Sequence, residues 1–168
     1  MAEGSILERL ESHLQDELKL HRSLLNVAER KRDQIVAGNI PAFSQVLSEE
    51  QGLLQRGHDL RRVRDAILQV CAKHFSCPHE QLRLAQVLER APEPLRSQLA
   101  GTRMELRAVL ERLREINERN LLLIRQSLSF VQDVLSIIHG SSITALDYDQ
   151  QGQKQAGAGG GGIISTTC

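Results

Sequence analysis

The sequence predicts an all-α fold, an antiparallel bundle of three long helices and one short helix followed by a flexible C-terminal tail. Apolar residues recur at three- and four-residue steps over long stretches, and Gly and Pro interrupt these stretches at only a few points. Strand-like alternation is missing before the final residues. Hydrophobic residues make up 40% of the chain and aromatic residues only 2%, so Leu supplies most of the apolar mass.

The first two helices are predicted on either side of a short break. Ser5, with Glu8 three residues later, can cap a helix that runs to about Ile35. Gly38 suits the position after a helix, and Pro41 suits the first turn of the next one. The second helix runs to about Lys73 and packs antiparallel on the first. Its inner side is expected to contain Phe43, Val46, Leu47, Leu54, Val63, Ile67 and Val70.

A short helix and the longest helix complete the predicted bundle. Pro78 ends the second helix, and residues 80–90 form a short helix before Pro92 and Pro94. The longest helix is expected from about Glu93 to Gly140. The bundle domain thus covers residues 1–140. Residues 141–168 form a flexible Gly-rich tail whose front part, with Ile143, Leu146 and Tyr148, can fold on meeting a partner.

The longest helix carries an apolar face between Asn117 and Gly140 that is too wide for one packing contact. One row has apolar residues at three- and four-residue steps, namely Leu121, Ile124, Leu128, Val131, Leu135 and Ile138, and the face is widened by Leu123, Phe130, Val134 and Ile137. This helix is either an ordinary core helix or a core helix that also binds a partner helix. A membrane span is not expected, because Arg125, Gln132 and Asp133 interrupt a run that needs about 20 mostly apolar residues.

Asn117 and Asn120 lie near the apolar row of this helix. A buried amide needs a hydrogen-bond partner, and an Asn within such a row often fixes the register of helix pairing. The sequence therefore predicts that these residues set the register. The alternative is that they bind a docked partner.

Composition excludes several classes of function. Lys and Arg number 21 and Asp and Glu number 21, so no net charge attracts nucleic acid or an anionic membrane. Neither a phosphate-binding loop nor a Ser/His/Asp arrangement is recognisable, and neither enzymatic activity nor a cofactor is expected. The three cysteines occur without a signal peptide, which indicates a cytoplasmic protein.

Two further motifs have alternative interpretations. Cys71, His74, Cys77 and His79 are zinc-ligand types, but their spacing does not match the usual motifs, and the end of a helix with a core thiol explains them as well. His58, followed by Leu60, Arg61 and Arg62, resembles the site of histidine phosphotransfer domains. That family has a small residue at the position of Arg62, so a solvated histidine is the competing interpretation.

Several local patterns resemble the FlgN family of flagellar export chaperones. The resemblance covers about Leu7 to Gly152. It includes Lys31, the Gly38-Asn39 break, Glu50, Arg64, the pair Asn117 and Asn120 with the following leucines, the segment 127–131, and Tyr148 with Gly152. The family usually has Asp at the position of Asn39, and either residue can cap a helix.

The resemblance implies a non-enzymatic cytoplasmic chaperone of flagellar type III secretion. Its expected partners are the hook-filament junction proteins FlgK and FlgL and the export gate protein FlhA. The expected partner-binding residues are Leu128, Val131, Leu135, Ile138, Ile143, Leu146 and Tyr148. We expect a monomer or a weak homodimer that binds neither nucleic acid nor membrane. A structural bundle protein that self-associates through the same face is the alternative.

Overall fold

The computed structural model describes the backbone of residues 2–78 and 84–144 and the side chains of residues 6–78 and 84–139. These residues form four α-helices, α1 (Ala2–Ala37), α2 (Ile40–His74), α3 (Leu84–Arg90) and α4 (Leu95–Thr144), and include no strand. The all-α prediction is therefore confirmed. The chain divides into two units, Met1–Ile124 and Arg125–Cys168, and the boundary lies within α4.

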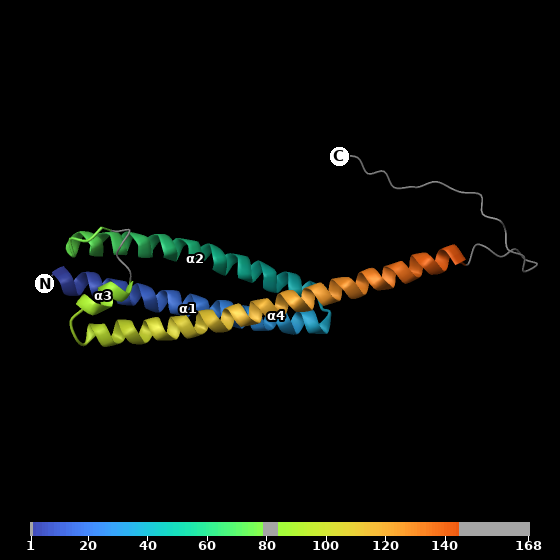
Figure 1. Cartoon of the computed structure of the whole chain (residues 1–168), viewed down its shortest axis with the longest axis horizontal. Helices are drawn as coiled ribbons and strands as arrows, with labels where there is room; N and C mark the ends of the chain where they lie inside the picture. Colours follow the sequence, from blue (N-terminus) through green and yellow to red (C-terminus); the bar gives the residue numbers. More distant parts are fainter. Residues whose placement is uncertain (1, 79–83, 145–168) are drawn as a thin grey trace, which may run out of the picture. The chain divides into compact units, whose positions relative to one another are not determined.

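In the first unit, α1, α2 and the beginning of α4 run side by side (Figure 1). Ion pairs from Lys31 to Glu50 and from Arg64 to Glu17 show that α2 runs antiparallel to α1. The side chain of Gln15 donates to Thr102, whereas Asn120 donates to the carbonyl of Ala28. Residue numbers rise together in these two contacts, so α1 and α4 run in the same direction, each antiparallel to α2.

The turn between α1 and α2 follows the rules for helix ends closely. Gly38 has a φ of 63°, and its N–H donates to Ile35 while the N–H of Asn39 donates to Gln34. These two bonds satisfy carbonyls that would otherwise lack partners at the end of α1. The side chain of Asn39 accepts from the N–H of Ala42 and so caps α2. The predicted break is confirmed, and Gly38 and Asn39 alone connect the two helices.

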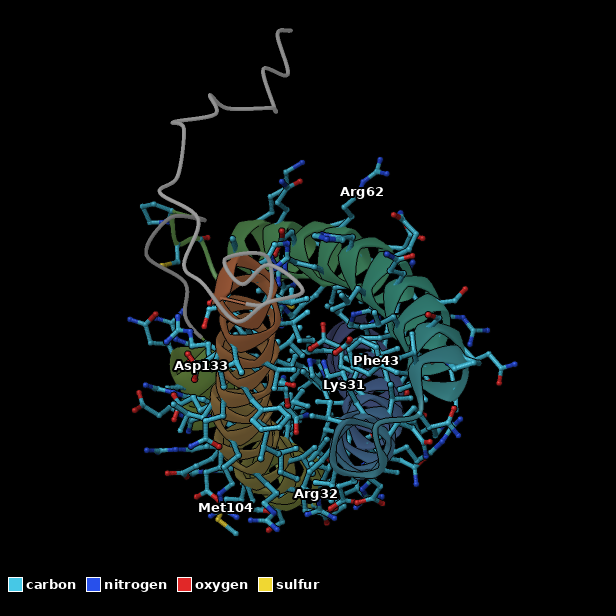
Figure 2. The ribbon with its side chains drawn as sticks, turned by 90° about the vertical axis from the view of Figure 1, so that its right-hand side faces the viewer. Lys31, Arg32, Phe43, Arg62, Met104 and Asp133 are labelled. Carbon is cyan, nitrogen blue, oxygen red and sulfur yellow. The ribbon has the colours of Figure 1, made fainter. Side chains whose placement is uncertain are left out.

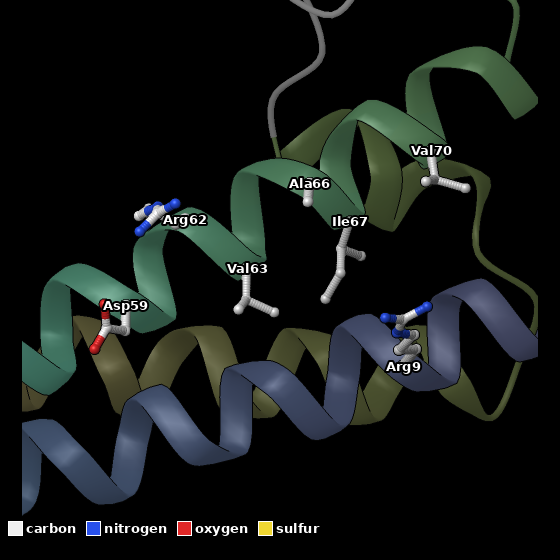
Figure 3. A pocket seen from close by; sticks show the side chains of 7 residues that line it. All are labelled: Arg9, Asp59, Arg62, Val63, Ala66, Ile67 and Val70. Carbon is white, nitrogen blue, oxygen red and sulfur yellow. The ribbon is translucent and has the colours of Figure 1, made fainter.

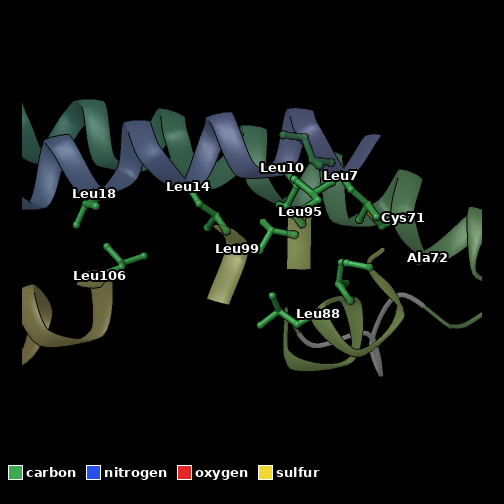
Figure 4. Packing of buried hydrophobic residues seen from close by; sticks show 13 residues of the cluster. Leu7, Leu10, Leu14, Leu18, Cys71, Ala72, Leu88, Leu95, Leu99 and Leu106 are labelled. Carbon is green, nitrogen blue, oxygen red and sulfur yellow. The ribbon is translucent and has the colours of Figure 1, made fainter. Parts of the chain in front are cut away.

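The core joins all four helices at the end where the chain passes through α3 (Figure 4). Its members are almost wholly buried: Leu7, Leu10, Leu14 and Leu18 of α1, Ile67, Cys71 and Ala72 of α2, Val87 and Leu88 of α3, and Leu95, Leu99 and Leu106 of α4. Each buried Leu or Val contributes about 1.5–3 kcal/mol relative to an exposed one. Close packing continues along α1 and α2, where a Cβ at Gly57 would lie 3.3 Å from Leu20 Cδ2.

The inner side of α2 differs from the prediction. Val46 and Ile67 are buried, but Leu54, Val63 and Val70 are 50%, 45% and 48% exposed. Cys71 and Ala72 are buried in their place. The spacing of apolar residues identifies a broad stripe of the helix, but it does not show which part of that stripe the neighbouring helices cover.

The helix boundaries also differ from the prediction at two places. The longest helix begins at Leu95 rather than Glu93, and it continues through Gly140 to Thr144. The expected stop at Gly140 was wrong, because a helical Gly costs only about 1 kcal/mol relative to Ala and need not end a helix. For the short helix, the described part begins at Leu84, and the expected residues 80–83 lie outside the described residues.

Candidate partner-binding surface

The second half of α4 exposes its large apolar side chains. From Ile124 to His139 every residue is exposed. Within the second unit we call the following residues the apolar face: Leu128, Phe130, Val131, Val134, Leu135, Ile137 and Ile138, whose exposed fractions range from 37% for Val134 to 68% for Phe130. Contiguous apolar surface of this kind marks an interaction site in water-soluble proteins.

Most of the partner-binding residues predicted from the sequence lie on this apolar face. Leu128, Val131, Leu135 and Ile138 are 57%, 51%, 48% and 54% exposed. Ile143 lies within α4, although its side chain is outside the described part. Leu146 and Tyr148 lie outside the described residues. The structure thus places four of the predicted residues on one exposed helix surface.

The opposite side of this segment is polar and mostly bonds to the helix itself. The hydroxyl of Ser136 donates to the carbonyl of Asp133 at 2.7 Å, and His139 Nδ1 lies 2.8 Å from the carbonyl of Leu135. Arg125 and Asp133 supply one positive and one negative charge. This strip therefore offers no strong charge preference, and apolar burial is the main source of binding energy available here.

Polar residues inside the bundle hold the helices together. Lys31 Nζ lies 2.6 and 2.8 Å from the two carboxylate oxygens of Glu50, and both side chains are largely buried. Figure 2 shows Lys31 on the inner side of α1, whereas Arg62 and Met104 point outward. Arg64 Nη1 donates at 2.9 Å to the buried carboxylate of Glu17, and His13 Nε2 lies 3.3 Å from the same group. The contacts of Lys31 with Glu50 and of Arg64 with Glu17 join α1 to α2, so Lys31, Glu50 and Arg64 have structural roles.

Asn120 also acts within the bundle. It is 2% exposed, and its Nδ2 donates at 2.9 Å to the backbone carbonyl of Ala28 on α1. The side-chain oxygens of Asn117 and Asn120 are buried and accept no hydrogen bond from the described residues. The bond to Ala28 agrees with the predicted register role of Asn120.

A shallow pocket lies between α1 and α2 (Figure 3). Arg9 reaches it from α1, and α2 supplies the rest of the lining: Asp59, Arg62, Val63, Ala66, Ile67 and Val70. The exposed fractions of Val63 and Val70 show that this pocket is open to solvent. Its ionic groups are exposed surface side chains and do not converge on a common point within the view (Figure 3).

The residues considered for metal binding and phosphotransfer lie on α2 or just after it. Cys71 is fully buried, and this burial raises the pKa of its thiol, so the thiol stays protonated at neutral pH. Cys77 is partly exposed, and His79 lies outside the described residues. No group of three or more His, Cys, Asp or Glu among the described residues could hold a metal ion. His58 is exposed, as is Arg62 one turn further on.

Among the described helices, α4 is the only one long and apolar enough, by length and composition, to cross a membrane. Unlike the core helix of a soluble protein, its apolar segment is not buried, and Arg125 and Asp133 lie in that segment. Length and composition are therefore weak evidence for a span.

Searches of curated proteins and of solved structures gave no significant match. A family model described as FlgN protein matches residues 1–156, which includes all the described helices. This match covers most of the chain. The chain therefore belongs to the FlgN family of flagellar export chaperones.

Proposed function

We propose that this protein is a cytoplasmic chaperone that binds the amphipathic terminal helices of hook-filament junction proteins of the FlgK and FlgL type. Its family is one of flagellar export chaperones and is not a known enzyme family. The observation that carries the proposal is the exposure of Leu128, Val131 and Leu135 on α4. Their spacing of three and four residues matches the way one helix docks on another.

The proposed mechanism is competition for an apolar helix surface. A client that polymerises through amphipathic helices cannot do so while those helices lie on α4. Burying each large apolar side chain contributes about 1.5–3 kcal/mol, and ordering the client segments offsets part of this gain. The resulting affinity is moderate, which allows the client to be released before export.

The proposal also includes delivery. Ile143, Leu146 and Tyr148 fold over the bound client, and Tyr148 contacts the export gate protein FlhA. This part rests on the family resemblance of the segment after α4. In this proposal the role of the bundle is to support α4.

The substitution Val131→Asp tests client binding directly. We expect the complex with FlgK or FlgL fragments to be lost. A buried charge without a partner makes the binding free energy less favourable by roughly several kcal/mol. Titration calorimetry measures the affinity, and circular dichroism measures helix content. Since Val131 is 51% exposed, the helix content should remain near that of the wild type.

Ser129→Asp is the matched control, because it adds the same charge on the polar side of the same helix turn. It should bind clients as the wild type does. Equal binding by Val131→Asp and the wild type would contradict the proposal. A stable homodimer that involves the apolar face and ignores both clients would instead support a structural, self-associating protein.

A further inference from the structure

The apolar face of α4 can be divided into two adjoining rows. The first row is Leu128, Val131, Leu135 and Ile138, and the second row is Phe130, Val134 and Ile137. With 3.6 residues per turn, the centres of the two rows are about 110° apart around the helix axis, and together they span about 180°. The seam between two paired helices is narrower than the apolar stripe of about 100° or more that faces a whole core, so one client helix does not cover both rows.

The second row continues the register of the row that α4 uses inside the bundle. In the first unit that inner row is buried or half-buried, and its steps alternate between three and four residues: Leu99, Thr102, Leu106, Val109, Leu113, Ile116, Asn120 and Leu123. The same steps lead on to Ser127, Phe130, Val134 and Ile137. Phe130 and Ile137 are 68% and 65% exposed. The register that packs against other helices in the bundle thus recurs where the side chains are exposed.

The first row belongs to a different register of α4. Seven-residue steps back from Leu128 lead to Leu121 and then to Arg114 and Arg107, which are exposed and charged. Steps back from Val131 lead to Ile124, the half-buried Asn117 and Leu110, which is 41% exposed. This register is mixed along the bundle, and it is continuously apolar and exposed only from Leu121 onward. Each of the two rows has the three- and four-residue spacing that a helix neighbour requires.

We propose that a client is held as a pair of amphipathic helices, one on each row, so that its two terminal helices and α4 form a three-helix unit. This inference rests on the proposed function and specifies how the client is bound. One client helix packs on the second row, and the other packs on the first row. Because the polar strip of this segment is nearly neutral, the client is selected by the spacing of its apolar residues and not by its charge.

Two other occupants fit the rows less well. A second copy of this chain that pairs through one row would leave the other row of each copy exposed. The chain's own residues 145–168 contain the run Gly159-Gly160-Gly161-Gly162, a poor helix former, and too few apolar residues to match both rows. Two helices from one client cover both rows at once.

The experiment compares two client ligands. One is full-length FlgK-type protein, and the other is a peptide of its C-terminal helix alone. For the double variant Phe130→Gln, Ile137→Gln, we expect affinity for the full-length client to fall on the order of tenfold or more while the peptide binds as it does to the wild type. Val131→Asp should weaken binding of both ligands. Ser129→Gln, on the polar side, should change neither.

The outcomes separate this inference from the proposed function. If the double variant binds the full-length client as tightly as the wild type does, or weakens both ligands equally, the two-helix arrangement is wrong although the chaperone function stands. If Val131→Asp also binds both ligands normally, the proposed function fails. A free homodimer that the double variant dissociates, with no effect on client binding, would assign the second row to self-association and overturn the inference.

Discussion

Asn120 shows how one polar side chain can fix the position of α4 along α1. Its Nδ2 donates to the carbonyl of Ala28, while its own oxygen is buried without a hydrogen bond from the described residues. An unsatisfied buried acceptor lowers stability, so the amide favours one register at some energetic expense. Leu99 and Ile116, which share the inner row of α4, have no such directional bond and would pack in neighbouring registers almost as well.

We therefore expect Asn120→Leu to leave the free energy of unfolding unchanged or to raise it by about 1 kcal/mol, while the register becomes less well defined. Spin labels at Ser23 and Glu111, both exposed, would measure the distance between α1 and α4 in a background with the native cysteines replaced. The wild type should give one narrow distance distribution and the variant a broad one. A narrow distribution in both proteins would show that Asn120 does not set the register.

The ion pair of Lys31 and Glu50 leads to a second prediction at this scale. Lys31→Met leaves the Glu50 carboxylate, 18% exposed, without its cation, and we expect a loss of roughly 1–3 kcal/mol in urea unfolding. Lys19→Met is the control, because Lys19 and Asp16 form an exposed pair worth about 0.5 kcal/mol or less. Equal stability of the two variants would mean that the bundle does not depend on the buried pair.

At the scale of helices, the amino-acid sequence was sufficient to predict the four elements and the turn at Gly38. The prediction from sequence failed where burial depends on which surfaces the neighbouring helices cover. Leu54 and Val63 have helical spacing but lie where the other helices leave α2 exposed. The stop predicted at Gly140 failed because Gly weakens a helix without forbidding it. For the binding surface, the spacing of apolar residues identified the first row. The role proposed for Phe130 and Ile137 depends on the inner row of α4, and that row could be identified only from the burial of its side chains in the structure.

The exposed part of α4 has a measurable consequence. Residues 125–139 have no buried side chains, and a helix of this length that buries little apolar surface is marginal in water. We expect its amides to exchange with deuterium much faster than those of residues 99–120, and client binding should slow them. Mass spectrometry of peptic fragments measures both effects. Slow exchange in the free monomer would show that this segment is stabilised without a client.

On the scale of the whole molecule, stability and binding are expected to separate at Ile124. The core residues of the bundle all precede this position, whereas the apolar face follows it. Truncation after Ile124 should therefore shift the thermal midpoint by no more than about 3 °C and abolish client binding. Calorimetry and a binding titration measure the two properties. A much larger drop in the midpoint would show that the second unit contributes to folding.

The balanced charge of the chain has a consequence for solubility. With a formal net charge of zero at pH 7 and a sequence isoelectric point near 7.0, charge repulsion between molecules is weakest around neutral pH. The exposed side chains of α4 then favour precipitation, and sulfate salts strengthen this tendency. Under the proposed function, a bound client would remove that surface from water, and the complex should therefore precipitate less readily near pH 7 than the free protein.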